Sequence, residues 1–461
     1  MKSETVIEAV KELAMKRGIT VYLVGGYLRD RLMRRKSTDV DVVMETDALE
    51  FARELSRVFG YPSPIFYGRF GTAMVEEDGV KLELATCRTE SYPPDSRKPE
   101  VFRATIAQDL SRRDFTINAI ALNLLTGEIL DPFGGRADIK AKVIRTPVDP
   151  DKTFYDDPLR ILRGIRFAAR FHFTIEPLTR DAMRRNVERL AIVSQERIAE
   201  EVMKMLEASQ PSLAFYLLDE VGALASLLPE VSVLKEKGTD HACKDLFEHT
   251  LKTLDNISRH TRNVYLRLAM LLHDIGKPRT LKVEEGKVSF HRHELVGEKM
   301  SRNVCQRLKI GVAETVYIGR LIRYHLWPHL LAKEEPTDKG LRRFIREVGK
   351  ERKDLFTLAR ADLTSQNPEK VRKALTRLNE LEKRVKEVNR RSRLSSFKLA
   401  LDGHEIMKML GIGPGRVVGG IKDYLEQQVM DGVLKNTKRE LKKELGQRGQ
   451  QILQQVQSRL E

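Results

Sequence analysis

Residues Val21–Met44 read VYLVGGYLRDRLMRRKSTDVDVVM, and this stretch decides how the rest of the chain is interpreted. The apolar run at its start, Val21–Val24, predicts a buried strand. This strand ends at Gly25-Gly26, where the backbone can turn tightly and approach a ligand because neither glycine carries a Cβ. Arg29 and Asp30 follow at the expected start of a helix. The two glycines and the helix start behind them can therefore hold phosphate groups.

The second half of the stretch carries two carboxylates, Asp39 and Asp41, in another apolar run. Residues two apart in a strand share a face, so both carboxylates point the same way. Adjacent carboxylates repel each other and would destabilise a plain core, and their natural partner is a hard divalent cation. Such cations stabilise the attacking and leaving oxygens in phosphoryl transfer. A Gly-Gly turn or an Asp-x-Asp pair alone is compatible with an ordinary strand edge, whereas their combination favours a metal and nucleotide site.

With Arg29-Asp30 between them, these motifs resemble the nucleotidyltransferases of the DNA polymerase β superfamily. More narrowly, they resemble the class II tRNA nucleotidyltransferases, or CCA-adding enzymes, and the bacterial poly(A) polymerases. Two later motifs follow in the order typical of that family, RRDFTINA from Arg112 and DPFGG from Asp131. The resemblance covers roughly the first half of the chain.

Between these motifs, Gly71–Val75 and Val80–Ala85 predict a hairpin around Asp78-Gly79. Glu83 alternates with leucines on the second strand and could face the two aspartates as a third carboxylate. It could equally be an exposed strand glutamate. Arg88–Leu110 is polar, irregular and proline-containing, and is expected to be a mobile loop over the site.

Charged side chains near the glycine turn complete the expected nucleotide site. Arg112-Arg113-Asp114 could be a surface ion pair, but beside a phosphate site they favour triphosphate and ribose contacts. Asp156–Arg170 predicts one helix with arginines every three residues. It resembles the family's EDxxR motif, with Asp156 at the glutamate position. The resemblance implies a nucleotide-binding set of Gly25, Gly26, Arg29, Arg113, Asp114, Asp157, Arg160, Arg163 and Arg166.

Within that set, Asp157 and Arg160 match the residues that read the base edge of the incoming nucleotide. An aspartate can accept a hydrogen bond from the exocyclic amine that cytosine and adenine share. An arginine can donate to the acceptor atom beside that amine. Uracil and guanine present the opposite pattern, so protein side chains could select CTP and ATP.

The second half contains a series of histidines, and LAMLLHDIGKP places His273-Asp274 at the end of an apolar helix. This resembles an HD-domain metal site, known from some bacterial tRNA nucleotidyltransferases, where it is linked to phosphohydrolase activity. Neutral imidazoles and a carboxylate suit a divalent ion such as Mn, Ni, Fe or Mg. A lone His-Asp pair would more often be a structural hydrogen bond. The ligand set that the resemblance implies is His249, His273, Asp274, His293, His325 and Asp362.

Composition sets further bounds. A chain of 461 residues should hold several domains, and its formal charge of +16 favours a polyanionic partner such as nucleic acid. A basic helix at 369–391 and a basic C-terminus from Lys435 carry part of that charge. Three separated cysteines suggest a reducing compartment, and no run is apolar for long enough to span a membrane. A cytoplasmic protein is expected.

We therefore expect an α+β nucleotidyltransferase head, a mixed sheet with flanking helices, followed by an all-α neck, HD domain and helical tail. The expected boundaries are 1–150 for the head, 151–235 for the nucleotide- and RNA-binding neck, 236–370 for the HD domain and 371–461 for the tRNA-binding tail.

The resemblance implies a tRNA nucleotidyltransferase that adds CCA, or part of it, to tRNA 3′ ends from CTP and ATP. Asp39, Asp41 and Glu83 would be its catalytic carboxylates, with Mg²⁺ held by the two aspartates. Alternatives within the family add only A, only CC, or poly(A). An HD-type phosphohydrolase acting on RNA or nucleotides, and a non-catalytic RNA-binding protein, are alternatives from other classes. The head motifs argue against the first of these two and the paired carboxylates against the second. The oligomeric state is not predicted.

Overall fold

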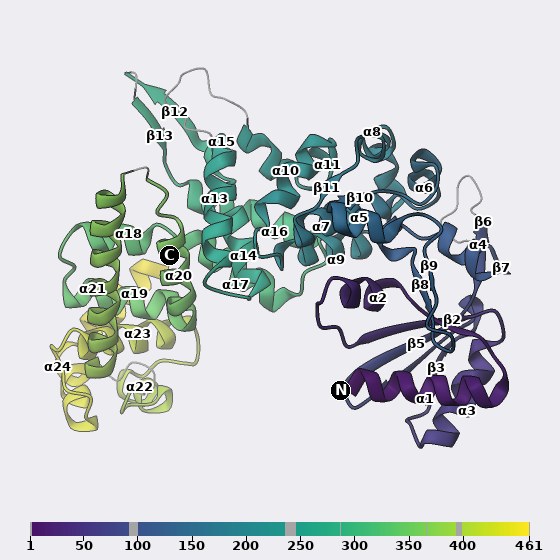
Figure 1. Cartoon of the computed structure of the whole chain (residues 1–461). Coiled ribbons are helices and arrows are strands. Elements are labelled where there is room, and N and C mark those ends of the chain that lie inside the picture. The colour runs from purple at the N-terminus through teal and green to yellow at the C-terminus, as the bar shows by residue number, and fades with distance from the viewer. Residues whose placement is uncertain are drawn as a thin grey trace. The chain divides into compact units, whose positions relative to one another are not determined.

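The computed structural model describes residues 2–91, 100–235, 246–285, 287–365, 367–392 and 399–460 (Figure 1). The chain separates into two compact units, Met1–Gly319 and Arg320–Glu461. The first unit contains the large sheet and the helices that follow it, and the described elements of the second are helical. Among the described helices, none combines the length and apolarity needed to cross a membrane.

The first unit is built on a mixed sheet with the strand order β3-β4-β5-β2-β1-β8-β9. Strands β2 and β5 run parallel, and the other neighbours run antiparallel. The strands of this sheet are β1 (Val21–Val24), β2 (Asp39–Met44), β3 (Ile65–Tyr67), β4 (Thr72–Glu77), β5 (Val80–Thr86), β8 (Ala121–Asn123) and β9 (Ile129–Leu130). The predicted hairpin around Asp78-Gly79 is confirmed as β4 and β5.

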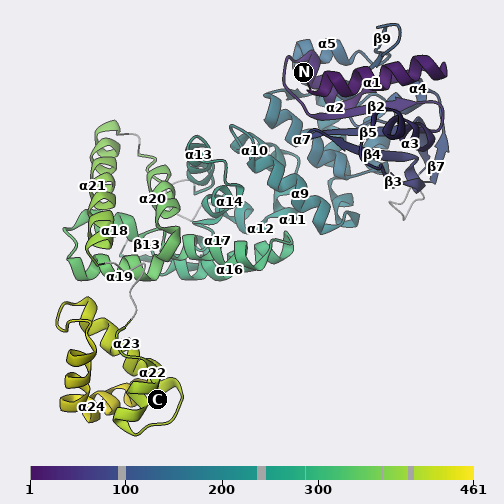
Figure 2. The same cartoon turned by 90° about the horizontal axis from the view of Figure 1, so that it is seen from below.

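Helices α1 (Lys2–Arg17) and α3 (Ala48–Phe59) supply the apolar residues that cover one face of this sheet (Figure 2). Val40 and Val42 of β2 are buried in that core. Because side chains alternate along a strand, Asp39 and Asp41 between them belong to the opposite face. The predicted α+β head, with its mixed sheet and flanking helices, is therefore confirmed.

Two sequence predictions for the head need correction. Helix α2 (Gly25–Leu32) begins at Gly25 itself, not at Arg29. Arg88–Leu110 is not wholly irregular: β6 (Arg88–Ser91) pairs with β7 (Glu100–Arg103), and α4 (Ile106–Ser111) follows. A capping box at the start of α4 accounts for its position. Residues 92–99 of the expected loop lie outside the described residues.

The neck begins with two helices where one was expected. Pro158 separates α6 (Pro150–Asp156) from α7 (Leu159–Phe171), and Asp157 before it has an extended backbone. A residue that precedes proline is pushed out of the helical region, so a helix over 156–170 is wrong. The neck continues with α8 (Pro177–Asn186), α9 (Gln195–Leu206), α10 (Ser212–Glu220), α11 (Ala223–Leu227) and α12 (Pro229–Ser232).

A buried arginine, Arg267 of α14, is one of the residues that join the first described HD-domain helices to the neck. Its guanidinium donates hydrogen bonds to the carbonyl oxygens of Leu206 and Ala208 at the C-terminal end of α9. It also donates to those of Ser258 and Thr261 at the C-terminal end of α13. These contacts help to explain why neck and HD helices share one unit. Besides short 3-10 helices, this unit also contains α5 (Gly135–Ala141), β10 (Val143–Ile144), β11 (Thr174–Ile175), α13 (Leu246–Ser258), α14 (Val264–Leu272), α15 (Lys277–Thr280), β12 (Leu281–Glu284), β13 (Lys287–Phe290) and α16 (His293–Arg307).

The second unit contains the long basic helix predicted at 369–391, which the structure shows as α21 (Pro368–Ser392). Helices α22 (Gly403–Leu410), α23 (Arg416–Met430) and α24 (Lys438–Leu460) pack around their own apolar core, which includes Ile406, Ile421 and Leu441. The other helices of this unit are α18 (Trp327–Lys333), α19 (Asp338–Val348) and α20 (Arg352–Ala361), and α17 (Val312–Tyr324) contains the unit boundary.

Candidate active site

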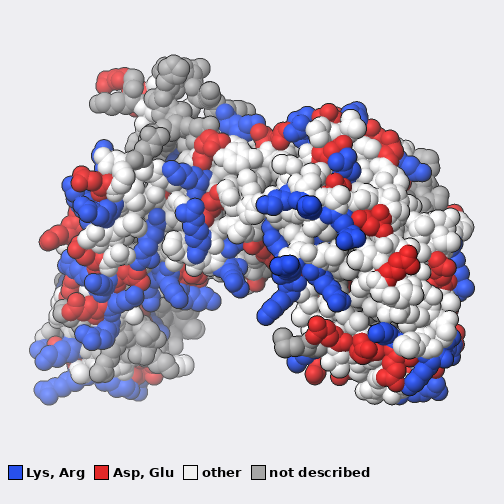
Figure 3. Space-filling view, viewed as in Figure 1, with Lys and Arg blue, Asp and Glu red and all other residues white. Residues whose placement is uncertain are grey.

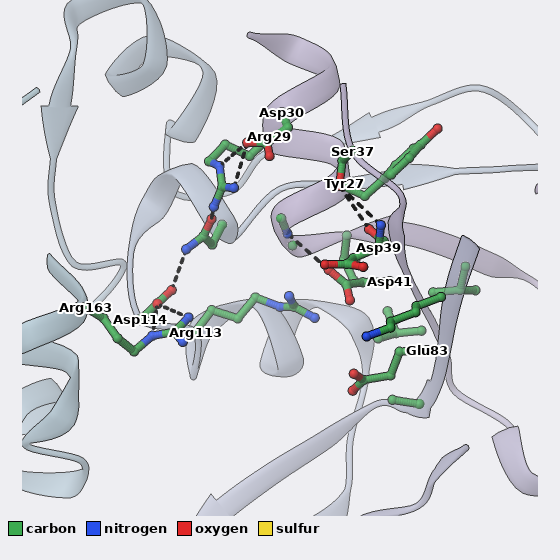
Figure 4. Close-up of a pocket in the computed structure, with 18 of the residues that line it drawn as sticks. Tyr27, Arg29, Asp30, Ser37, Asp39, Asp41, Glu83, Arg113, Asp114 and Arg163 are labelled. Carbon is green, nitrogen blue, oxygen red and sulfur yellow. Dashed lines mark hydrogen bonds and ion pairs between the residues drawn. The ribbon is translucent and has the colours of Figure 1, made fainter. Parts of the chain in front are cut away.

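Three carboxylates gather on the face of the sheet that α1 and α3 leave uncovered. The pairing of β2 with β5 places Asp41 directly opposite Glu83. Figure 4 shows Asp39 and Asp41 pointing the same way, with Glu83 facing them from the neighbouring strand. The structure thus brings together the three residues that the sequence suggested as carboxylate ligands.

The electrostatics of this cluster suit a cation. Burial raises the pKa of Asp41 to about 6, and the negative charges of Glu83 and Asp39 add to that effect. The guanidinium of Arg113 and the backbone N–H of Gly26, 3.2 Å from Asp41 Oδ2, oppose it. Ionising the whole cluster therefore costs free energy that a divalent cation with oxygen ligands would offset.

The glycine turn is forced by the close approach of this cluster. Gly25 has a φ of +65°, and a Cβ placed on it would lie 2.8 Å from Asp41 Oδ2 and 3.2 Å from Arg113 Nη1. Any larger side chain would therefore displace the carboxylate, and φ in this range favours glycine. The turn was expected from the sequence, and the structure gives its steric reason.

Arg113 is held by Asp109, a residue for which the sequence predicted no role. The buried Asp109 accepts hydrogen bonds from Arg112 at 2.7 Å and from Arg113 at 2.9 Å. Although burial acts to raise the pKa of Asp109, the two guanidinium groups lower it. The available signal was the spacing, since Arg112 and Arg113 follow Asp109 by three and four residues at the end of α4.

Asp114 lies in the wall of the site at the centre of a polar chain (Figure 4). Its carboxylate accepts a hydrogen bond from Arg163 at 2.8 Å and another from the Asn118 amide at 2.8 Å. Asn118 in turn accepts from the buried Arg29, which also pairs with Asp30. Burial opposes ionisation of Asp114, but Arg163 and Asn118 outweigh it and lower its pKa to about 2.

The arginines of α7 are held by partners distant in sequence. Arg160 donates to the carbonyl oxygen of Arg112 at 2.8 Å, and the buried Arg166 pairs with Glu201 of α9 at 2.6 Å. Arg197 of the same helix lies 3.5 Å from Asp157. Glu201 and Arg197 were not assigned roles from the sequence, because the α7–α9 contact is tertiary.

These groups share one cavity of about 1190 Å³, which extends from the carboxylates to the arginines of α7. Lysine and arginine side chains gather around the hollow beside α7 and α9 in Figure 3. Every nucleotide-site residue predicted from the sequence lines this cavity. The lining includes Gly25, Gly26, Arg29, Asp39, Asp41, Glu83, Arg113, Asp114, Asp157, Arg160, Arg163 and Arg166.

A second cluster of ligand-type residues lies in the same unit, at the end of α14. Oδ2 of Asp274 is 3.6 Å from His249 Nε2 and 3.2 Å from His273 Nε2, and Oδ1 is 3.5 Å from His293 Nε2. Lys277 also contacts Asp274, at 2.5 Å. Potential ligand atoms of His249, His273 and Asp274 lie within 4.8 Å of one another.

The hydrogen bonds of these histidines leave the correct nitrogen for a metal. His273 and His293 each place Nδ1 within 2.8 Å of the carbonyl oxygen three residues earlier. A carbonyl only accepts, so Nδ1 carries the proton and Nε2 keeps its lone pair for coordination. This donor set fits a divalent ion.

The last two predicted HD ligands belong to the second unit. His325 is buried, and its Nδ1 lies 2.7 Å from the carbonyl oxygen of Ile322. Asp362 lies 3.4 Å from His329, which the sequence analysis did not name. Their participation in one centre with the first unit's cluster stays a prediction.

Comparison with known proteins agrees with this geometry. Residues 21–145 match the family model of the poly A polymerase head domain, residues 172–234 that of a probable RNA and SrmB-binding site of polymerase A, and residues 246–377 the HD domain. The multifunctional CCA protein of Laribacter hongkongensis is 34% identical over 74% of this chain and 84% of its own. The A-adding tRNA nucleotidyltransferase of Deinococcus radiodurans is 30% identical over 87% of this chain and 89% of its own.

Solved structures give the same result. The CCA-adding enzyme of Bacillus stearothermophilus in complex with CTP superposes with a TM-score of 0.67 and 25% identity, covering 96% of each chain. The Thermotoga maritima CCA-adding enzyme complexed with tRNA shares the fold, with a TM-score of 0.59 and 22% identity over 99% of this chain and 95% of that one.

Proposed function

The chain belongs to the family of tRNA nucleotidyltransferases that includes the CCA-adding enzymes, and from that premise we propose that it adds CCA, or part of it, to tRNA 3′ ends from CTP and ATP. The observation that carries the proposal is the single cavity. It has a carboxylate cluster that suits metal ions at one end and an array of fixed arginines at the other. A phosphohydrolase whose head only tethers RNA would need neither this cluster nor its glycine turn.

We propose that Asp39 and Asp41 hold Mg²⁺, with Glu83 as the third carboxylate of the cluster. When bound, Mg²⁺ supplies the positive charge that activates the attacking 3′-hydroxyl and stabilises the α-phosphate and the departing pyrophosphate. The Gly25-Gly26 turn and the guanidinium of Arg113 then orient the phosphates beside the carboxylates. Asp109 keeps that guanidinium in place.

The α7 side of the cavity is proposed to bind the base and sugar of the incoming nucleotide. Asp157 accepts from the exocyclic amine of cytosine or adenine, and Arg160 donates to the ring acceptor beside it. Arg163, which Asp114 holds in place by an ion pair, contacts the triphosphate or ribose. Arg29 and Arg166 are buried in ion pairs with Asp30 and Glu201. We therefore propose that they stabilise the cavity wall and do not contact the nucleotide directly.

The product is the finer question, because the relatives include both a multifunctional CCA protein and an A-adding enzyme. The decisive experiment offers purified protein three tRNAs, ending at the discriminator base, after one C and after CC, with labelled CTP or ATP. A full CCA enzyme extends all three with the correct nucleotide. An A-adding enzyme extends only the third, a CC-adding enzyme only the first two, and a poly(A) polymerase continues past one A. No incorporation into any of the three would contradict the proposal.

A second function is favoured by the cluster around Asp274. We propose that His249, His273, Asp274 and His293 bind a divalent metal, and that the HD domain hydrolyses phosphomonoesters or 2′,3′-cyclic phosphates. The support is the convergence of three Nε2 atoms on one buried carboxylate. His325 and Asp362 complete the proposed ligand set.

A further inference from the structure

The row of carboxylates continues across the sheet as a row of apolar side chains. Asp41 of β2 lies opposite Glu83 of β5, Glu83 opposite Met74 of β4, and Met74 opposite Ile65 of β3. Directly opposed residues share one face of a sheet. One step along, Tyr67 lies opposite Thr72 on that same face. The reactive face therefore extends from the carboxylates to the edge strand β3.

The outer part of this row is exposed although it is apolar. The exposed fraction of Ile65 is 54% and that of Tyr67 is 48%. Phe66 between them belongs to the other face, where the guanidinium of Arg53 lies 4.6 Å from its ring centroid. Exposed apolar side chains on one face next to a reactive site indicate a surface that binds a ligand or a macromolecule.

A further aromatic ring bridges this edge to the cavity. Phe70, which follows β3, and Met74 both line the cavity that holds the carboxylates. Arg88 of β6 fixes the segment, since its Nη1 donates to the carbonyl oxygen of Phe70 at 2.7 Å and to Thr72 Oγ1 at 3.2 Å. The Arg88 guanidinium also lies 5.4 Å from the Phe70 ring centroid.

We propose that Ile65, Tyr67, Phe70 and Met74 form a stacking platform for the last nucleotides of the single-stranded RNA 3′ end, and that Arg88 is a positioning residue for Phe70. This rests on the proposed nucleotidyl transfer. The incoming nucleotide occupies the arginine-lined side, so the attacking hydroxyl has to reach the carboxylates from the opposite side, where the platform lies. The exposed Lys81, opposite Asp39, supplies a cation beside that path.

The chemistry of the platform suits this occupant better than a protein. Bases stack on aromatic and apolar side chains without sequence preference, because every base has a π-face. An enzyme that adds nucleotides in succession has to accept different terminal bases, first the discriminator base and then cytosine. A platform that reads no base edge meets that requirement, whereas the base-reading groups lie on the other side of the α-phosphate.

The test uses the full-length protein and a tRNA with 2-aminopurine at its 3′ end. Stacking quenches the fluorescence of this base. We expect quenching with the wild type and with Tyr67→Phe, and its loss with Tyr67→Ala and Phe70→Ala. The same two alanine variants should raise KM for tRNA by roughly 5- to 100-fold, the range that loss of one base–aromatic stack allows. The Kd for CTP should not change. Phe66→Ala, the same kind of residue on the other face, is the matched control.

Arg88 is tested through a double variant. If it acts by positioning Phe70, Arg88→Ala should weaken quenching, and combining it with Phe70→Ala should add nothing further. Additive losses would contradict that role.

Each other result has a distinct meaning. Unchanged quenching and KM in both alanine variants, with normal CTP incorporation by the wild type, would overturn the platform and leave the proposed function standing. No incorporation by the wild type would remove the function itself. If Ile65→Lys altered the mass measured by light scattering but not RNA binding, the face would be a contact between copies of this chain and the platform would be wrong.

Discussion

At the residue scale, burial and the neighbouring charges determine the pKa values of the carboxylates in the site. Asp41 is raised in pKa because it is buried and two other carboxylates share its face, whereas Asp114 is lowered because Arg163 and Asn118 face it. The first arrangement is costly until a cation binds, and the second is stable without one. Substitution of Asp41 should therefore act mainly on catalysis, whereas substitution of Asp114 should also lower stability.

Replacing Asp41 or Asp39 with alanine should abolish nucleotide incorporation while tRNA binding stays nearly intact. Losing one of the cation's ligands removes several kcal/mol of transition-state stabilisation, and each ~1.4 kcal/mol is a factor of ten in rate. The measurements are single-turnover incorporation of labelled CTP and filter binding of tRNA. Glu76→Ala, an exposed carboxylate on β4, which β5 separates from β2, is the control that should retain activity. Near-normal turnover of either aspartate variant would rule out the metal assignment.

Asp114→Asn should lower stability and raise KM for the nucleotide, because Arg163 loses the carboxylate that orients it. The fall in pKa from 3.8 to about 2 corresponds to about 2 kcal/mol of folding free energy. A carboxyl group whose pKa is lower in the folded protein stabilises the fold at pH values above its pKa in the unfolded chain. The difference in free energy of unfolding between wild type and variant should thus be full above about pH 5 and vanish towards pH 2. Denaturant unfolding at several pH values measures this.

A pH-independent difference would indicate that the variant acts through packing instead. Glu200→Gln, which removes an exposed partner of Lys204 on α9, should have little effect at any pH because exposed ion pairs contribute little.

At the element scale, sequence patterns predicted local features such as which face of a strand a side chain occupies. They missed contacts between residues that are distant in the sequence. The alternation in Asp39–Met44 identified the carboxylate face because period two alone determines it. The hairpin of Thr89 with Phe102 was missed because the prolines between them dominate the local pattern. The break at Pro158 was readable from proline chemistry but was overridden by the regular spacing of arginines. The pairing of Arg166 with Glu201 required the fold itself.

The junction of α6 and α7 should set base choice. Asp157 follows the end of α6 and Arg160 lies in the first turn of α7, so the break brings both side chains to the cavity. With Asp157→Ala the discrimination against UTP should shrink, because UTP then meets no acceptor facing its carbonyl. With Arg160→Ala, kcat/KM should fall for CTP and ATP alike, since a charged donor is lost. The measured quantity is the ratio of CTP or ATP use to UTP use.

If these two residues only brace the neck, both variants should lose thermal stability while that ratio keeps its wild-type value. Arg189→Ala, a neck arginine that binds a backbone carbonyl away from the cavity, is a matched control for stability alone.

The cluster at the end of α14 should work independently of the head. His273→Ala or Asp274→Ala should remove hydrolysis of 2′,3′-cyclic phosphates and phosphomonoesters in the presence of added Mn, Ni or Mg, and spare CTP incorporation. Metal content by elemental analysis should fall in the same variants. His260→Ala, at an exposed histidine after α13, should change neither property. Loss of nucleotide addition in a folded variant would show that the two sites are coupled, and a wild type without hydrolysis would make the cluster structural.

At the scale of the whole molecule, we expect nucleotide binding and RNA binding to depend on different groups of basic residues. The chain has a formal charge of +16. In the cavity, Arg113, Arg163 and Arg166 pair with Asp109, Asp114 and Glu201. In the second unit, α21 presents Lys373, Arg377 and Lys383 on its exposed side. Such charges act at a distance on a polyanion and contribute little to folding.

We therefore expect tRNA affinity to fall steeply with salt and to depend on α21. Neutralising three of its exposed basic residues, as Lys373→Gln, Arg377→Gln and Lys383→Gln together, should weaken tRNA binding and reduce the slope of log K against log[salt]. The reduction should reach about 0.9 for each RNA phosphate that the variant no longer neutralises. KM for CTP should stay constant, because the cavity is untouched.

The control neutralises three basic residues of the head, Lys11, Lys16 and Arg57, on helices α1 and α3 behind the sheet. An equal loss of affinity in the control would show that only net charge matters, and no loss in either variant would place the RNA-binding surface on the neck.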